Sequence, residues 1–245
     1  MTSRILFAAV LAAIPLAGTG TLPEGLAFPA AAQAESATAL ANSAEAKLVE
    51  AAYRTADEAA ALATLEAALA EANRALALAP AHENARLQKA AALGYRAKLT
   101  RSRSDAKAAR ALFREIVTDN PRSAAGWAGL GGWHGEAVTN IGKFMAGTML
   151  GAKTDSALEA FSRAHRLAPD DPVISTLYAI NAIGLKERDS AAEIRALLEP
   201  VARGTGGGPL AELMRANARK LLGVIDDPDA LRRNAYDMRP FDRFV

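Results

Sequence analysis

Apolar residues along most of the chain are spaced three or four positions apart, which is the period of one buried face of an α-helix. The segment that carries Leu62, Leu65, Leu69 and Leu76 is typical. Val, Ile and Thr never gather into the alternating runs that a half-buried strand requires. The pattern therefore predicts an all-α fold.

Proline, glycine and polar residues interrupt this pattern and divide it into about eight to ten helices, which we expect to pack as antiparallel pairs. The predicted helices are 43–56, 57–79, 82–99, 104–119, 124–150, 154–168, 170–185, 190–202 and 209–222. The first two could also form one long helix. The glycine-rich residues 204–208 are predicted to be a connector. Residues 226–245 are predicted to be a tail that either caps the domain or stays loose.

A short motif of alanine, an aromatic residue and proline recurs within these segments. Its copies are Ala109, Phe113 and Pro121; Ala157, Phe161 and Pro169; and, in a weaker form without the aromatic residue, Ala68, Ala72 and Pro80. A second motif follows Pro121 and consists of Trp127, Leu130, Gly131 and His134. In a helix its two bulky side chains share one face, and the glycine leaves a notch at which a neighbouring helix can approach.

These two motifs resemble the second and first halves of a tetratricopeptide repeat, with His134 in an aromatic place. The resemblance implies helix pairs stacked in a right-handed superhelix over residues 35–225, with a concave surface lined by the first helix of each pair. The concave positions that it implies are Asn84, Leu87, Tyr95, Glu136, Thr176, Ile180 and Ile183. Because most of them are apolar or small, they favour an apolar helix or extended segment of a partner over a peptide carboxylate.

The motif prolines are farther apart than the roughly 34 residues of such repeats. Most of the excess lies in residues 138–151, which are apolar and rich in small side chains. This insertion and its flanks, over residues 132–169, are similar to the repeat domain of the regulator of microtubule dynamics family. That similarity also implies an adaptor-like helical repeat protein rather than an enzyme.

The amino-terminal residues have the layout of a cleavable signal peptide over residues 1–34. Arg4 precedes a mostly apolar stretch, and Ala32 and Ala34 occupy the positions that a signal peptidase inspects, which predicts a mature start at Glu35. An uncleaved membrane anchor is the alternative. The chain has no cysteine, which excludes a disulfide and a lipoprotein anchor. We therefore expect an exported bacterial protein of the periplasm.

Composition and charge narrow the choice of partners. Hydrophobic residues make up 51% of the chain and aromatic residues only 5%, so few side chains are available to stack on bases, and we expect no nucleic acid. The net charge is only +2, but bases gather in one predicted basic patch, Arg96, Lys98, Arg101 and Arg103. This patch could attract an acidic peptide, an anionic lipid surface or a polyanion, or it could be an ordinary solvated helix face.

The sequence lacks the usual patterns of catalytic, cofactor and metal sites. His82, His134 and His165 belong to different repeats, and neither HExxH nor CxxC occurs, so no metal site is expected. No G-x-S-x-G elbow accompanies the serines, and the glycine-rich connector lacks the Lys-Ser/Thr of a phosphate loop. We expect no enzyme activity and no cofactor.

Three hypotheses of function remain open on the sequence. The leading one is a periplasmic scaffold that binds a protein partner through the concave groove and the 138–151 insertion. The second is an envelope enzyme or small-ligand carrier with a pocket around Trp133, His134 and Glu136. The third is association with a membrane surface through four residues of the insertion, Phe144, Met145, Met149 and Leu150.

Overall fold

The computed structural model describes residues 30–185 and 191–244 of the 245-residue chain. Within these residues the fold is all-α, with eleven helices, a short 3-10 turn and no strand. The helices are α1 (Ala30–Tyr53), α2 (Glu58–Leu78), α3 (Glu83–Thr100), α4 (Arg103–Asp119), α5 (Ala124–Ile141), α6 (Lys143–Leu150), α7 (Thr154–Leu167), α8 (Pro172–Leu185), α9 (Ala191–Ala202), α10 (Gly208–Gly223) and α11 (Pro228–Asp237). The 3-10 turn η1 (Asp242–Phe244) ends the described chain.

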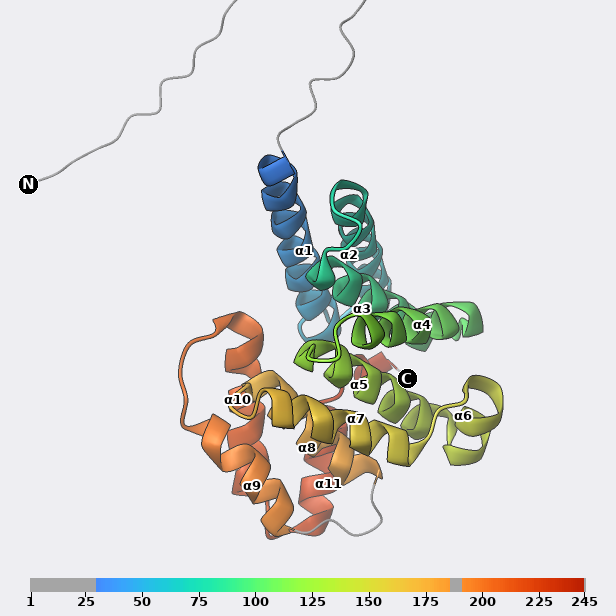
Figure 1. Ribbon diagram of the computed structural model, residues 1–245. Coiled ribbons are helices and arrows are strands. Elements are labelled where there is room, and N and C mark those ends of the chain that lie inside the picture. Colours follow the sequence, from blue (N-terminus) through green and yellow to red (C-terminus); the bar gives the residue numbers. More distant parts are fainter. Residues whose placement is uncertain (1–29, 186–190, 245) are drawn as a thin grey trace, which may run out of the picture.

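The helices pack mainly with near neighbours in sequence. α1 packs on α2, α3 on α4, α5 on α7, and α8 on both α9 and α10 (Figure 1). The first members of these groups, α1, α3, α5 and α8, also contact one another in this order, and the contact is smallest between α3 and α5. In Figure 1, α1 and α2 stand at the top of the molecule, and α7 to α11 form its lower half.

The repeated motif marks equivalent places in three helices. Pro80, Pro121 and Pro169 each lie two positions after the last residue of their helices, α2, α4 and α7. Proline fits there because it has no amide hydrogen to donate and cannot continue a helix. The other members of the motif are all buried: Ala68, Ala72, Ala109, Phe113, Ala157 and Phe161. The motif therefore combines a helix end with the packing surface of the turns before it.

The predicted helix 124–150 is two helices in the structure, α5 and α6. Gly142 separates them with a φ of +79°, and Gly151 ends α6 with a φ of +68°. Both values lie in the left-handed region, which glycine adopts without steric cost. The sequence signal was the pair of glycines, but glycine is also frequent inside α5, where Gly126, Gly129 and Gly131 are all helical.

The first helix is longer than predicted. α1 begins at Ala30 rather than near Ser43, and it runs through the predicted cleavage site between Ala34 and Glu35. The rest of the predicted signal segment, residues 1–29, lies outside the described residues. None of the described helices is both long and apolar enough to cross a membrane.

Gly131 lies at the contact between α5 and α7. A β-carbon at this position would be 2.8 Å from Cδ2 of Phe161 and 3.1 Å from the carbonyl oxygen of Ala157. Both distances are shorter than van der Waals contact, so the two helices can pack this closely only around a glycine. At the adjacent Gly132, the nearest atom to such a β-carbon is Cζ of Phe161, at an ordinary 3.9 Å.

This difference predicts opposite effects of two neighbouring substitutions. Gly131→Ala should lower the free energy of unfolding by about 1–3 kcal/mol, because the new methyl group overpacks the helix contact. Gly132→Ala should leave it unchanged or raise it by up to about 1 kcal/mol, because alanine favours the helical backbone. Urea unfolding of both variants measures the difference. Equal effects would show that the notch at Gly131 does not limit the approach of α7.

Candidate functional site

A groove lies along the first helices of the successive groups. Its cavity volume is about 1180 Å³, it is partly open to solvent, and its lining is mainly apolar. Typical lining residues are Leu48 on α1, Leu87 on α3, Ala128 on α5 and Leu177 on α8, and α6 adds Met149. A second hollow between α8 and α11 is smaller, at about 330 Å³.

Polar groups also line the groove, where α1 faces α3. Gln88 donates to the side-chain oxygens of Asn84 at 2.7 Å and Glu45 at 3.5 Å. Asn84 in turn donates to Asn42 at 3.2 Å. These side chains are already hydrogen-bonded to one another, so they form a polar border beside the apolar lining.

The structure brings five of the seven predicted concave residues into this groove: Asn84, Leu87, Tyr95, Glu136 and Ile180. The other two, Thr176 and Ile183, do not line it. Thr176 is fully buried and donates to the carbonyl oxygen of Met214 at 3.2 Å. Ile183 is 1% exposed and packs in the core formed with α9, α10 and α11. Both are core residues because α10 and α11 cover the face of α8 that a plain repeat would leave open.

The carboxyl-terminal tail folds back into the groove. Phe241 is completely buried, and its ring lies 5.2 Å from that of Tyr95 on α3. The guanidinium of Arg243 donates to the carbonyl oxygens of Ala51, Ala52 and Thr55, at 2.5–2.9 Å. A cation is favourable there because the last carbonyls of α1 have no partner within the helix. These contacts attach the end of the tail to α1 and α3.

Four charged side chains meet where the tail passes between α3 and α5. Lys98 Nζ lies 2.8 Å from Glu136 Oε2 and 2.6 Å from the carbonyl oxygen of Pro240, and it also pairs with Asp242. Arg239 holds both carboxylate oxygens of Glu136, at 2.9 and 3.1 Å. The side chains of Lys98, Arg239 and Asp242 are only 6%, 6% and 3% exposed. We call these four residues the tail ion network.

The network favours the charged form of Glu136. Burial raises the pKa of Glu136, but the pairing with Lys98 and Arg239 outweighs it and holds the pKa below its ordinary value. For Asp242 burial prevails and the pKa is raised. Burial also raises the pKa of the Tyr53 and Tyr95 phenols beside the network, so both stay protonated at neutral pH.

The predicted basic patch does not form one surface. Lys98 is buried in the tail ion network. Arg96 is paired with Asp105 at 2.8 Å and with Glu66 at 3.2 Å. Arg101 and Arg103 are exposed and line the groove at the turn between α3 and α4.

The residues of the second predicted pocket point to different places. Trp133 and Glu136 line the groove, with the Trp133 indole donating to the carbonyl oxygen of Ala106 at 2.8 Å. His134 is not part of the lining, and its Nδ1 accepts the amide of Lys153 at 3.2 Å. In the part of the chain that the structure describes, no group of three or more His, Asp or Glu side chains could hold a metal ion.

The sequence analysis did not identify Phe241, Asp242 or Arg239 as members of this site. Arg239 lies 103 positions from its partner Glu136, and Asp242 lies 144 positions from Lys98. The available signal was the mixture of aromatic and charged residues in a segment that follows the last predicted helix. Such a composition indicates a docked tail, but it does not identify the partners.

Comparison of the chain with known protein families, with curated proteins and with solved structures found no match. The resemblance to helical repeat families therefore depends on the motif residues and on the places that they occupy in the fold.

Removal of Lys98 tests the energetic weight of the tail ion network. Lys98→Met leaves two buried carboxylates with one cation fewer, so the free energy of unfolding should fall by about 3–5 kcal/mol. Arg54→Met is the matched control, because it removes a base from the exposed pair with Glu50, and its effect should stay within about 0.5 kcal/mol. Urea unfolding of the two variants gives both values. If Lys98→Met lowered the free energy of unfolding by less than about 1 kcal/mol, the network would not be what holds the tail to α3 and α5.

The buried His134 predicts a specific loss of stability in mild acid. Burial, together with Arg110 and Arg114, lowers the pKa of His134 to about 4, from 6.5. The unfolded chain therefore binds the proton more tightly than the folded chain. The contribution of neutral His134 to the free energy of unfolding is complete above pH 6.5 and is lost as the pH falls toward 4. Between pH 7 and pH 5 the wild-type chain should lose about 2 kcal/mol more than His134→Asn, whose side-chain oxygen can still accept the Lys153 amide. Urea unfolding at both pH values checks this, and parallel losses in the two proteins would refute it.

Proposed function

We propose that the chain is a non-enzymatic scaffold that binds an apolar helix or extended segment of another protein in its groove. In this proposal the helix groups form a tetratricopeptide-like, right-handed superhelix, and the groove is its concave face. The repeated motif supports this arrangement, because its members occupy equivalent places in α2, α4 and α7. The signal-like residues 1–34 place the scaffold, within the same proposal, in the bacterial periplasm.

The observation that carries the proposal is the mainly apolar groove of about 1180 Å³. This volume exceeds the roughly 300–1,000 Å³ of typical small-molecule sites. Leu87 and Leu177 supply half-buried apolar contacts on two of the first helices, α3 and α8, which lie on either side of α5 in the series. An amphipathic helix or extended segment that lies along such a groove buries its apolar face against several helices at once.

The charges of the groove also favour an apolar occupant over a free carboxylate. The two buried cations of the lining, Lys98 and Arg239, are already paired with Glu136 and Asp242. To bind these buried cations, a partner's carboxylate would have to displace one of the acids, which would then lose its own partner. Arg101 and Arg103 are the exposed bases of the lining. Methionines from α6 add flexible, polarizable contacts that adapt to apolar surfaces of different shape.

Substitution of two lining leucines tests this proposal. Leu87→Asp combined with Leu177→Asp places two charges on the apolar lining. Each substitution should weaken the binding of a partner at least about tenfold. The control is Leu78→Asp combined with Leu167→Asp, two leucines of α2 and α7 that are 39% and 38% exposed outside the groove. Tyr95 and Ile180 are unsuitable targets, because Tyr95 packs on Phe241 and Ile180 is only 2% exposed.

Quantitative pull-down from a cell-envelope extract compares the wild-type chain with both double variants, after urea unfolding has confirmed that all three are folded. We expect the control variant to recover the partners of the wild-type chain and the groove variant to lose them. Equal recovery by the groove variant would overturn the groove as the binding surface. Recovery of an apolar small molecule in organic extracts of the wild-type chain, without a protein partner, would favour a ligand carrier instead.

A further inference from the structure

Helix α6 presents an unusual number of apolar side chains to solvent. Phe144 is 80% exposed, Met145 is 46% exposed, and Ile141, just before the helix, is 42% exposed. Of the four insertion residues predicted to meet a membrane, Met149 and Leu150 are half-buried and line the groove. The exposed apolar surface therefore consists of Ile141, Phe144 and Met145, of which Ile141 and Met145 also line the groove.

The opposite side of α6 is held firmly to the molecule. Arg110 of α4 donates to the carbonyl oxygen of Leu150 at 3.0 Å, at the end of α6. Ala146 is completely buried, and α6 packs on α5 and α4. Because α6 is fixed in this way, its exposed side chains project from a defined surface rather than from a loose segment.

Exposed basic side chains lie on α6 and around the turn between α3 and α4. Arg101, Arg103, Lys107 and Lys143 are all exposed. Residues 137–153 contain no acid, and Asp105 in the neighbouring turn is paired with Arg96. Arg101, Arg103 and Met145 line the same hollow, so the turn between α3 and α4 lies close to α6.

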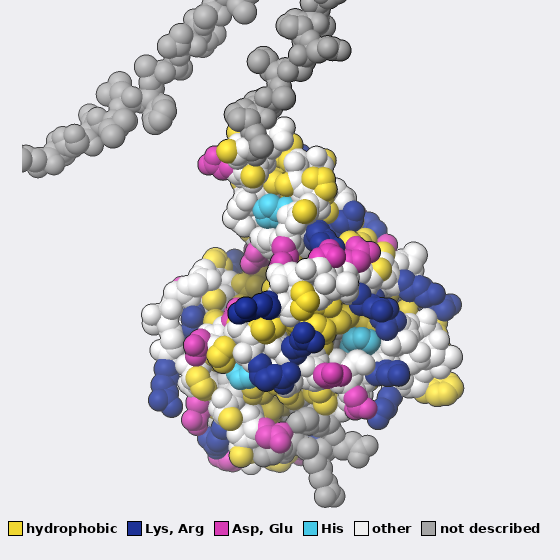
Figure 2. Space-filling view, in the orientation of Figure 1, with side chains coloured by type: hydrophobic (Ala, Val, Ile, Leu, Met, Phe, Trp, Pro, Cys, Tyr) yellow, Lys and Arg dark blue, Asp and Glu magenta, His cyan; other side chains and the backbone are white. Residues whose placement is uncertain are grey.

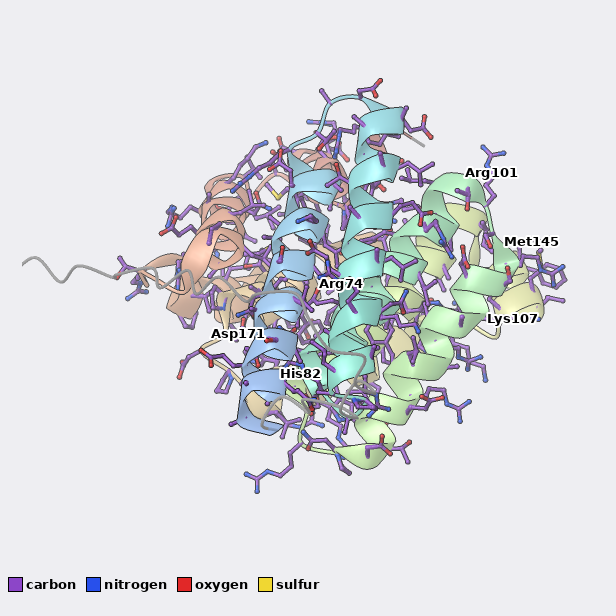
Figure 3. The ribbon with its side chains drawn as sticks, turned by 90° about the horizontal axis from the view of Figure 1, so that it is seen from above. Arg74, His82, Arg101, Lys107, Met145 and Asp171 are labelled. Carbon is purple, nitrogen blue, oxygen red and sulfur yellow. The ribbon has the colours of Figure 1, made fainter. Side chains whose placement is uncertain are left out.

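The figures show the same arrangement. In Figure 2, hydrophobic side chains reach the outer edge of the molecule where α6 lies, with Lys and Arg side chains beside them. Figure 3 shows Arg101, Lys107 and Met145 at one side of the molecule, away from α1. Basic and apolar groups thus share one outer surface, which we call the α6 surface: Ile141, Phe144, Met145, Arg101, Arg103, Lys107 and Lys143.

We infer that the α6 surface docks on an anionic lipid bilayer. Its apolar side chains enter the boundary between head groups and acyl chains, while its bases bind the anionic head groups. A helix of two turns is small for the roughly 800 Å² that each partner contributes to a stable protein complex. A fluid bilayer needs no complementary pocket, so a projecting phenylalanine suits it better. The α6 surface shares Arg101, Arg103, Ile141 and Met145 with the groove lining, whereas Phe144, Lys107 and Lys143 lie outside it, so substitution of Phe144 separates this inference from the proposed function of the groove.

A fluorescent label on α6 tests the inference directly in the full chain. The chain contains no cysteine, so Thr148→Cys carries a single environment-sensitive dye one helical turn after Phe144. Ala67→Cys, at an exposed position of α2, carries the control dye. With vesicles of phosphatidylglycerol and phosphatidylcholine, dye emission should increase at position 148 and stay constant at position 67. Vesicles of phosphatidylcholine alone should give a much weaker response.

Substitutions on the labelled chain identify the groups that bind. Phe144→Asp should weaken vesicle binding, read from the dye response, at least about tenfold. The double variant Arg101→Glu with Arg103→Glu should weaken binding by a similar factor and reduce its dependence on salt concentration. Leu78→Asp and Arg233→Glu are matched controls at other exposed positions and should have little effect. All labelled chains share residues 1–29, so any lipid binding by that segment is common to them.

Three results would overturn the inference. They are a constant emission at position 148, equal changes at positions 148 and 67, and an unchanged response in Phe144→Asp. A response to a soluble acidic peptide in the absence of vesicles would also overturn it and would assign the surface to a protein partner.

Discussion

The tail ion network is the interaction on which the rest of this structure depends. It joins α3, α5 and the carboxyl terminus at the point where the series of first helices has its smallest direct contact. Taking four charged groups out of water is unfavourable, and their mutual attraction largely offsets this cost without a large net gain in stability. The network therefore fixes the position of the tail rather than adding much stability, because Lys98 can pair with Glu136 and Asp242 together only when the tail lies in one place. The network thus sets the distance between α3 and α5 and, with it, the width of the groove.

This arrangement also decides what the groove can recognise. Because the buried cations and acids of the network pair with one another, the remaining lining is mainly apolar, with a hydrogen-bonded polar border and two exposed bases, Arg101 and Arg103. The tail forms part of the wall of the groove through Met238, Arg239 and Pro240. Phe241 has a φ of +62°, which is costly for a residue other than glycine, yet its ring is completely buried against Tyr95. Burial of the ring and the caps made by Arg243 on α1 hold this conformation in place.

Local patterns in the sequence were sufficient to predict the all-α fold and most helix ends, because proline position and helical period act over a few residues. The same patterns could not show that α10 and α11 cover α8, so Thr176 and Ile183 were expected in the groove and lie in the core. The motif did predict the close approach at Gly131, where Phe161 and Ala157 of α7 lie, but no local pattern showed that Gly142 breaks the helix. The partners of Arg239 and Asp242 were hidden for a third reason, their distance along the chain.

Helix α6 connects the two surfaces proposed to bind. Met149 and Leu150 face the groove, while Phe144 faces outward from the same two turns. Arg110 donates to the carbonyl oxygen of Leu150 and so ties the end of α6 to α4. An occupant of the groove that shifts α6 also shifts its outward side chains. In the same way, a contact at the outer surface that shifts α6 changes the lining of the groove. Any such coupling must be reciprocal, since binding at each site changes the free energy of binding at the other by the same amount.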